Sequence, residues 1–226
     1  MRTSIVALLA SAVIAAPAAA SLERITNQDA IAGLKAALEK GSGVAVAALG
    51  RTDGFFGNGA VRIPLPESLK RYERLMRGVG LGRYADELIL TMNRAAEAAV
   101  PEAKALLVDA VKKMTVQDAK GILTGGETAG TEYFKRTTSD PLRARFLPIV
   151  QKATKKVKLA EKYNEYAEKG AKFGLVSKEH ANLDQYVTQK ALDGLFYMVA
   201  EEEKKIRRDP IGAGTDIIRR VFGALK

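Results

Sequence analysis

Cysteine and tryptophan are absent from this chain, and its 226 residues include one histidine. Without cysteine the protein has no disulfide, no thiol nucleophile and no zinc site that uses thiolate ligands. The histidine, His180, lies in the polar stretch KEHANLD with no nucleophile signature beside it, so we interpret it as a solvated loop or helix-start residue rather than a catalytic base. Thiol enzymes and Cys/His zinc proteins are therefore excluded.

The chain also has no hydrophobic run long enough to cross a membrane. Its first stretch combines the positive Arg2, an apolar segment at 5–16 and small residues before Ser21, which is the pattern of a signal peptide. The apolar segment is shorter than the about 20 residues that a membrane span needs. We expect cleavage after Ala20, so that residues 1–20 are a signal peptide and the mature protein is periplasmic with no transmembrane segment.

Composition and charge indicate the domain organisation of the mature protein and the kind of partner that it could bind. Apolar residues make up 47% of the chain and charged residues 27%, a globular composition, so we expect residues 21–226 to form one helical domain whose core needs no disulfide. The formal net charge is +10 at pH 7. In an exported protein this favours an anionic envelope surface over nucleic acid as a partner. The favoured interpretation, however, is that the charge only keeps the protein soluble.

Apolar residues recur at helical spacing along most of the chain, and no alternating pattern reaches the length of a strand. We therefore predict an all-α fold, a single multi-helix bundle with a Gly/Pro-rich loop after the first helix. The widest apolar stripe lies near the C-terminus and predicts a helix packed against the rest of the bundle. The expected helices cover residues 29–49, 67–77, 84–113, 115–125, 127–136, 139–150, 152–178 and 183–209, with a short helix after Thr215.

Three local signals set the expected boundaries inside this bundle. Pro101 removes a backbone donor from a long alanine-rich helix, so we expect a kink or a break there. Thr115 and Asp118 have the spacing of a capping box. Ser139 followed by Pro141 predicts a new helix start, which divides that region into two helices.

The segment DGFFGNG at residues 53–59 is the irregular part of the predicted bundle. Its glycines do not follow a strand, so it lacks the context of a phosphate-binding loop. Two interpretations of Phe55 and Phe56 stay open. Either they project as an anchor for a ligand or a partner, or they fill the core where two helices meet. The second is favoured because aromatic side chains are mostly buried.

Carboxylates on the helices offer a different chemistry. Acidic side chains from facing helices bind metal ions in some bundles, but the Glu-x-x-His motif of di-iron bundles is missing here. The candidates are Glu97, Glu127, Asp193 and Glu202, and ion pairs with Arg94, Arg207 or Arg208 are the favoured interpretation. We predict no metal site, no cofactor and no catalytic residue, and the alternative is an acid–base pair formed by Glu97 and Asp193.

Several sequence runs are distinctive in combination and extend over almost all of the mature chain. They are DGFFGNGAVRIPLPESL (53–69), MNRAAEAAVPEA (92–103), MTVQDAKGIL (114–123), TEYF (131–134) and LDQYVTQKALDGLFYMVAEEEKKIRRDP (183–210). Together they resemble a bacterial exported-protein family, domain of unknown function 4197. The resemblance implies a helical fold and a signal sequence. It implies no activity, so no catalytic residue is carried over.

These observations favour a non-enzymatic periplasmic binding or interaction protein, whose partner is an apolar ligand such as a lipid, or an envelope protein, held in a helical groove. The candidate binding residues are Phe55, Phe56, Arg62, Asn93, Arg94, Glu97 and Asp193. One alternative is a carboxylate-based hydrolase or a metal-binding bundle. Another is a structural envelope protein that adheres to anionic surfaces through residues 152–178, which hold eight lysines and predict an exposed, partly mobile helix.

Overall fold

The structure, a computed structural model, describes residues 26–158, 160–161, 163–164, 182–210, 212 and 215–223. The predicted signal peptide and His180 lie outside these residues. Within them every regular element is a helix, which confirms the predicted all-α fold. In chain order the elements are α2 (Asn27–Leu49), α3 (Glu67–Gly78), α4 (Gly82–Ala99), the 3-10 turn η1 (Val100–Glu102), α5 (Ala103–Lys113), α6 (Val116–Leu123), α7 (Ala129–Thr154), α9 (Leu183–Arg208) and α10 (Asp216–Gly223).

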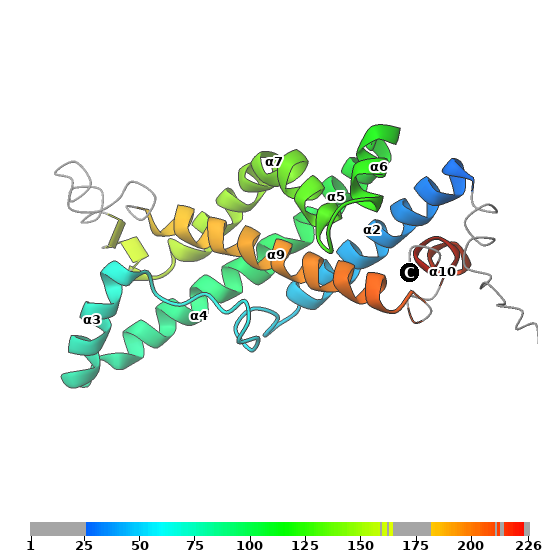
Figure 1. Ribbon diagram of the computed structural model, residues 1–226. Helices are drawn as coiled ribbons and strands as arrows, with labels where there is room; N and C mark the ends of the chain where they lie inside the picture. The colour runs from blue at the N-terminus through cyan, green and yellow to red at the C-terminus, as the bar shows by residue number, and fades with distance from the viewer. Residues whose placement is uncertain are drawn as a thin grey trace, which may run out of the picture.

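The core lies where the long helices α2, α4, α7 and α9 pack together. Figure 1 shows α9 crossing the middle of the molecule, and it packs against each of the other three. The apolar stripe expected on this helix is buried, because Leu183, Val187, Ala191, Leu195 and Val199 are at most 2% exposed. Full burial of one aliphatic side chain contributes about 1.5–3 kcal/mol. This stripe therefore holds α9 at the centre of the bundle.

Two of the three local boundary signals are confirmed. Pro101 lies in η1, between the end of α4 and the start of α5, because proline cannot supply the backbone donor that a continuous α-helix requires. At the start of α6 the Thr115 side chain accepts a hydrogen bond from the backbone of Asp118, and the Asp118 carboxylate accepts one from the backbone of Thr115. This reciprocal capping box satisfies two backbone donors that a helix start otherwise leaves free.

The third prediction, that a new helix starts at Ser139 and Pro141, was wrong. A single helix, α7, runs from Ala129 to Thr154 and contains both Pro141 and Pro148. The Ser139 hydroxyl does not cap a new helix, because it donates to the carbonyl oxygen of Lys135, four residues earlier, at 2.6 Å. The expected division into two helices is therefore absent.

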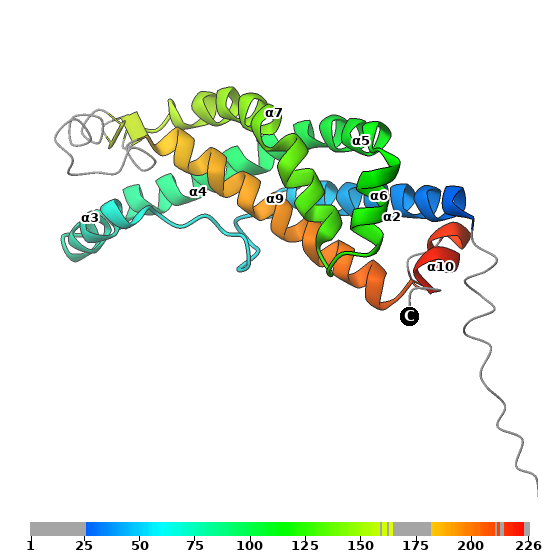
Figure 2. The same cartoon turned by 45° about the horizontal axis from the view of Figure 1, so that its top comes forward.

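Packing on both sides of Pro141 explains why α7 continues through it. Phe134, before the proline, and Leu142 and Phe146, after it, are all 0% exposed. Tertiary contacts of this extent outweigh the local preference of a proline to end a helix. Figure 2 shows that α7 bends partway along its length, which is the usual effect of proline inside a helix.

Helices α3 and α4 form a hairpin at the end of the molecule opposite α10 (Figures 1 and 2). The turn between them contains Gly80, whose φ of 79° lies in the left-handed region that glycine adopts without strain. Helix α3 packs mainly against α4. The hairpin therefore projects from the bundle with much of its surface open to solvent.

The described start of the lysine-rich segment packs more closely than the sequence suggested. Val157, Ala160 and Tyr163 are at most 8% exposed, and the Tyr163 hydroxyl lies 2.9 Å from the hydroxyl of Ser68 on α3. The exposure expected over 152–178 was therefore wrong for these apolar positions, whereas the described lysines around them are exposed. The mobility predicted for residues 152–178 stays a prediction, and residues 165–178 lie outside the described residues.

Candidate functional site

Residues 50–66, here called the anchored loop, join α2 to α3 and contain the predicted aromatic pair. The loop is held to α4 by Glu97, which is 4% exposed. Its Oε1 accepts hydrogen bonds from the backbone N–H of Phe55 at 3.0 Å and of Phe56 at 3.1 Å. A carboxylate is a strong acceptor for backbone donors. Glu97 therefore satisfies two N–H groups that have no helix or sheet partner.

Asn93 holds a later part of the same loop. It lies four residues before Glu97 and therefore on the same face of α4. Its Oδ1 accepts from the backbone N–H of Ile63 at 2.9 Å, and its Nδ2 donates to the carbonyl oxygens of Ile63 at 2.9 Å and Ile89 at 2.8 Å. Asn93 is 0% exposed, and these bonds meet the rule that buried amide groups are hydrogen-bonded.

Arg94 completes this arrangement at the protein surface. Its Nη1 donates to Glu97 Oε2 at 2.6 Å, and its Nη2 donates to Asp53 Oδ1 at 2.8 Å. The hydrogen bonds to Glu97 and then Asp53 raise the pKa of Arg94 above its ordinary value. Because Asp53 belongs to the loop and Glu97 to α4, the guanidinium ties the two together.

The two phenylalanines have different environments. Phe55 is 0% exposed, and a Cβ added to Gly194 of α9 would lie 2.6 Å from its ring, so Phe55 fills the core as the favoured interpretation predicted. Phe56 is half-buried. The guanidinium carbons of Arg62 and Arg94 lie 4.4 Å and 5.8 Å from its ring centroid, distances at which cations interact with an aromatic face.

The structure brings six of the seven predicted site residues together, but Asp193 is held elsewhere. Asp193 is exposed on α9, where its Oδ1 accepts from Gln189 Nε2 at 2.8 Å and its Oδ2 lies 3.8 Å from Lys190 Nζ. Next to Asp193, it is Gly194 that lies against Phe55 and Val61 of the anchored loop. Both oxygens of the Glu97 carboxylate accept hydrogen bonds, from two backbone donors and a guanidinium, whereas Asp193 contacts Gln189 and Lys190 of its own helix.

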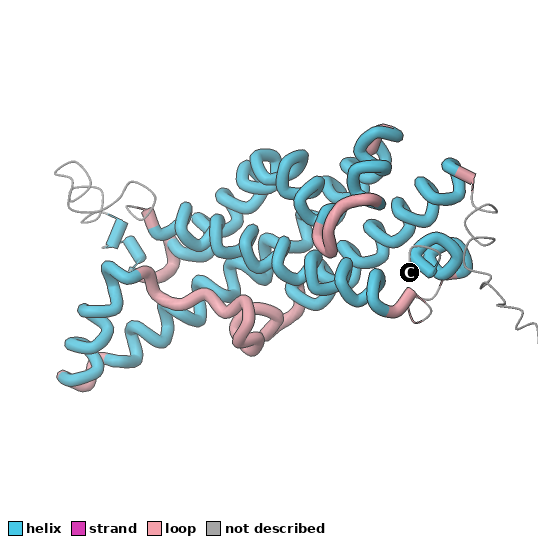
Figure 3. The backbone as a smooth tube through the Cα atoms, in the orientation of Figure 1, coloured by secondary structure: helices cyan, strands magenta, loops and turns pink. Residues whose placement is uncertain are grey.

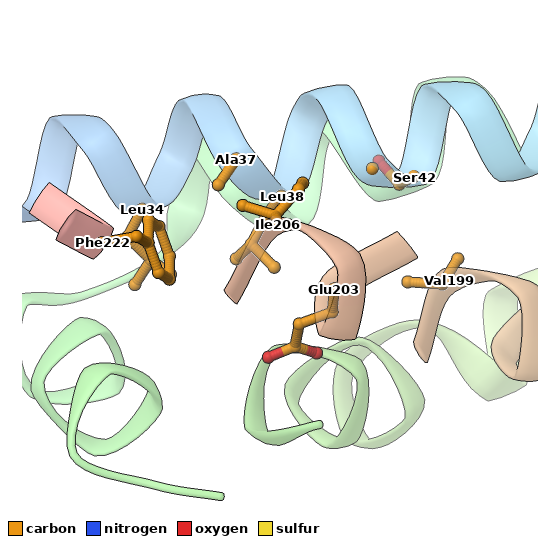
Figure 4. A pocket seen from close by; sticks show the side chains of 9 residues that line it. Leu34, Ala37, Leu38, Ser42, Val199, Glu203, Ile206 and Phe222 are labelled. Carbon is orange, nitrogen blue, oxygen red and sulfur yellow. The ribbon is translucent and has the colours of Figure 1, made fainter. Parts of the chain in front are cut away.

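Sequence reasoning did not single out Glu203, a second buried carboxylate. Its oxygens accept hydrogen bonds from the backbone N–H of Gly130 at 2.9 Å and of Thr131 at 2.8 Å, and from the Thr131 hydroxyl at 2.9 Å. Figure 4 shows the side chain pointing from α9 toward α7, where it meets the donors of the helix N-terminus. Arg207 donates to Glu203 at 2.9 Å. A glutamate followed four residues later by an arginine on one helix was the sequence signal that could have identified this carboxylate.

The cavity beside Glu203 tests the idea of an apolar ligand between helices. It is enclosed by side chains of α2, α9 and α10, including Leu34, Leu38, Val199 and Phe222. Its volume is about 10 Å³, which is room for about one water molecule. A lipid chain therefore does not fit into this cavity.

An exposed apolar cluster lies at the turn of the α3–α4 hairpin. It consists of Leu75, Val79, Leu81 and Tyr84, here called the hairpin tip, which are 60%, 72%, 45% and 40% exposed. Figure 3 shows the turn at the far end of the projecting hairpin. Several apolar side chains exposed together on a protruding element indicate an interaction surface. The sequence signal, an apolar series among arginines and glycines at 74–84, was not recognised.

Arginines of α3 and of the anchored loop interact with Asp86 of α4 in the hairpin. Arg77 donates to Glu73 at 2.9 Å and to Asp86 at 2.5 Å. The hydrogen bond from Arg77 lowers the pKa of Asp86, and the positive charge of Arg62 adds to this effect. Arg62 therefore lies within electrostatic reach of the hairpin as well as over Phe56, so positive groups extend from the anchored loop to the hairpin.

The other candidate carboxylates form ion pairs. Glu127 lies 3.6 Å from Arg208, as the sequence led us to expect, whereas Glu202 pairs with Lys205 at 2.6 Å. Among the described residues no three acidic or histidine side chains come together in a way that could hold a metal ion. In this same part of the chain, no helix combines the length and apolarity needed to span a membrane.

Comparison with known proteins gives a family without an assigned activity. The family model described as "Protein of unknown function (DUF4197)" matches residues 24–223, which is most of the chain. No curated protein and no solved structure matches this sequence significantly.

Proposed function

The chain belongs to the DUF4197 family, proteins of unknown function, and from this premise we propose that it is an exported, non-enzymatic protein that binds anionic membrane surfaces in the periplasm. One observation carries the proposal, namely that the hairpin tip projects from the bundle and exposes apolar side chains among arginines. The predicted signal peptide and the net charge of +10 support this location and an anionic partner.

The apolar side chains supply the first part of the binding energy. Leu75 and Val79 are 60% and 72% exposed, so both have most of their surface available for burial. Full burial of an aliphatic side chain contributes about 1.5–3 kcal/mol. A few such side chains give weak, reversible association, comparable to that of a single lipid chain. A second contribution is therefore needed for stable recruitment.

The arginines supply that second contribution. Arg74 is exposed and forms no ion pair within the described residues, and Arg83 donates only to the neutral hydroxyl of Tyr84, at 3.0 Å. Both guanidinium groups are therefore available for lipid phosphate. A cation near an anionic membrane contributes about 1 kcal/mol. The apolar and electrostatic contributions are of similar size, so binding requires both and weakens as salt concentration rises.

Vesicle flotation of the mature protein tests this proposal. We expect recruitment to vesicles that contain phosphatidylglycerol, little recruitment to vesicles of phosphatidylcholine alone, and loss of binding at high salt. Replacing Leu75 and Val79 together by serine should reduce the partition constant about tenfold, since roughly 1.4 kcal/mol corresponds to a factor of ten. Failure of anionic vesicles to recruit the protein at low salt would contradict the proposal.

Two exposed valines outside the tip provide a matched control. Val44 on α2 and Val116 on α6 are 43% and 57% exposed, so their replacement by serine removes comparable apolar surface elsewhere. We expect this double variant to bind vesicles like the unmodified protein. An equal loss of binding in the control would show that general hydrophobicity, and not the hairpin tip, is responsible.

The carboxylate enzyme is the weaker alternative. It requires Glu97 and Asp193 to act on one substrate, yet Glu97 already accepts from Phe55, Phe56 and Arg94. A general acid or base must be within hydrogen-bond reach of the proton that it transfers. Glu97 serves to hold the anchored loop instead, which is consistent with a binding protein.

A further inference from the structure

The second half of α7 and the turn after it carry positive charge that no carboxylate balances. Between Asp140 and Glu161 the sequence has two arginines and four lysines and no acidic residue. Arg143 pairs with Asp140 at 3.1 Å. The other five cations are exposed and form no ion pair within the described residues. They are here called the basic face and are Arg145, Lys152, Lys155, Lys156 and Lys158.

This surface differs from other charged surfaces of the bundle. Several exposed lysines elsewhere lie beside a carboxylate of the same helix, as in the pairs Lys113–Asp109 and Lys135–Glu132. Charges of alternating sign are usual for a solvated helix surface. On the basic face the positive charges follow one another without an acidic neighbour, so their fields add and attract an anionic partner.

Packing fixes the direction of the basic face. Leu142, Phe146 and Val150 on the inner side of α7 are 0% exposed, where α7 packs against α4 and α9. Arg145 and Lys152 are separated by about two helical turns, so both lie on the same side of α7. Since both are exposed, that side of the helix faces solvent rather than the core.

The lysines beyond the end of α7 are positioned by similar packing. Thr154, the last residue of the helix, donates from its hydroxyl to Asp184 Oδ1 at 2.5 Å, and Val157 is 7% exposed. The Asp184 carboxylate is itself 6% exposed, so it is directed inward and does not pair with the basic face. The lysines beside Val157 therefore lie on backbone that is packed against the bundle.

The basic face and the hairpin tip lie on different sides of α4. Helix α4 packs against both α3 and α7. Figure 2 shows the second half of α7 along the upper edge of the molecule, whereas α3 lies below α4. With the hairpin tip on a membrane, the basic face therefore remains open to a second partner.

The chemistry of the basic face favours lipid phosphate as that partner. Groups of about four to eight lysines and arginines on an amphipathic helix are typical of segments that attach to anionic lipid. Single-stranded nucleic acid, in contrast, is bound by stacking of its bases on aromatic side chains, and within residues 141–158 the one aromatic ring, Phe146, is 0% exposed. No large apolar side chain is exposed in this range either, so the contact is ionic.

We propose that the basic face is a second membrane contact, so that one molecule bridges two anionic membranes. The hairpin tip holds the first membrane, and Arg145 and the four lysines contact phosphate groups of the second. This inference rests on the function proposed for the hairpin tip. The two contacts differ in kind, because the tip combines apolar and ionic contributions whereas the basic face contributes charge alone.

Co-sedimentation of two vesicle populations tests the bridge. Dense sucrose-loaded vesicles and light fluorescent vesicles, both containing phosphatidylglycerol, are mixed with the mature protein, and the fluorescence that sediments with the dense vesicles is measured. We expect the unmodified protein to carry light vesicles into the pellet at low salt. Because charge alone holds the second contact, co-sedimentation should be lost at a salt concentration at which flotation still shows binding to single vesicles.

Removing charge from the basic face separates bridging from binding. The basic-face variant combines Lys152→Gln, Lys155→Gln and Lys156→Gln. It should lower co-sedimentation about tenfold, since each lysine near an anionic membrane adds to the attraction. Flotation should change by less than about twofold, because the distant hairpin tip is intact.

A matched control removes the same charge elsewhere. Lys104, Lys112 and Lys120 are exposed on α5 and α6 and, like the lysines of the basic face, form no ion pair within the part of the chain that the structure describes. Their joint replacement by glutamine should leave co-sedimentation unchanged. An equal loss in this control would show that net charge, and not the basic face, is responsible, and would overturn the proposal.

The remaining outcomes separate this inference from the proposed function. If flotation shows binding but light vesicles do not co-sediment, or if the basic-face variant bridges like the unmodified protein, the bridge is overturned and the hairpin tip stands as the membrane contact. If the basic-face variant loses flotation as well, α7 rather than the hairpin tip holds the membrane, and both proposals fail. If vesicles are not bridged but soluble polyphosphate binds the unmodified protein more tightly than the variant, the partner is a soluble polyanion and the bridge is again overturned.

Discussion

The two ends of α4 each carry side chains whose burial is unusual, and they do so in opposite ways. The second half buries polar groups, Asn93 and Glu97, at 0% and 4% exposure and bonds them to the anchored loop. The first half adjoins the hairpin tip, where Leu81 and Tyr84 are 45% and 40% exposed. These positions are exceptions to the usual distribution, because both halves of α4 otherwise bury apolar side chains such as Leu88 and Ala96. The buried polar groups stabilise the fold through hydrogen bonds, whereas no contact among the described residues accounts for the exposed apolar ones.

This comparison predicts that substitutions in the second half of α4 change stability, whereas substitutions at the hairpin tip change binding. The largest expected effect is that of Glu97→Ala, which leaves two backbone donors and Arg94 without their acceptor. We expect a loss of about 3–4 kcal/mol in the free energy of unfolding, measured by urea denaturation. Glu87→Ala, at an exposed position of the same helix, is the control and should change it by less than about 0.5 kcal/mol. A small effect of Glu97→Ala would show that the loop does not depend on α4.

Asn93→Ala tests whether a single buried polar residue of α4 holds the anchored loop. It removes the bonds to the N–H and carbonyl of Ile63, so we expect a loss of about 2–3 kcal/mol, from unsatisfied groups of about 1–3 kcal/mol each. Amide hydrogen exchange should accelerate at Ile63. If exchange accelerates equally throughout α9, the effect is global and the loop is not a local unit.

Elements with a local signal were predictable, whereas those decided by packing were not. The break at Pro101 and the capping box of Thr115 and Asp118 depend on adjacent residues, and the sequence contains those interactions in full. At Ser139 and Pro141 the same local reasoning failed. A serine shortly before a proline occurs both at the start of a helix and inside a bent helix, so these residues alone do not distinguish the two. The burial of the aromatic residues on either side decided the outcome.

The candidate site shows the same limit. Glu97 was identified as a carboxylate of interest, but its partners Phe55 and Phe56 lie 42 and 41 residues away, and no spacing rule encodes that contact. Asp193 was grouped with it because both lie on helices. The rotation of α9 instead presents Gly194 to the loop, and a shift of one residue in a helix turns the side chain by about 100°.

A pH titration tests whether the loop is also held from α9. The Tyr186 hydroxyl donates to the carbonyl oxygen of Pro64 at 3.0 Å, and burial, followed by the nearby Glu67, raises the pKa of Tyr186 from 10.0 to about 12. The neutral form is favoured in the folded protein, so this stabilisation is complete below pH 10 and is lost as pH rises toward 12. We expect it to amount to about 1–2 kcal/mol.

The measurement is denaturation at several pH values, with tyrosinate absorbance to follow ionisation. Tyr186→Phe should remove that part of the pH dependence between 10 and 12. Tyr197→Phe, at a tyrosine that is 47% exposed, should leave it unchanged. A profile that is the same in Tyr186→Phe and the unmodified protein would show that the hydroxyl does not hold the loop.

The smallest expected effect on stability belongs to the hairpin tip. Leu75→Ser with Val79→Ser replaces side chains that are 60% and 72% exposed, so little buried surface is lost and the free energy of unfolding should change by less than about 0.5 kcal/mol. The same variant is expected to lose most of its binding to anionic vesicles. Denaturation and flotation of one preparation therefore separate the two roles. If this variant unfolds as easily as Asn93→Ala, the exposed residues contribute to the fold, and the contrast between the two halves of α4 no longer indicates a binding surface.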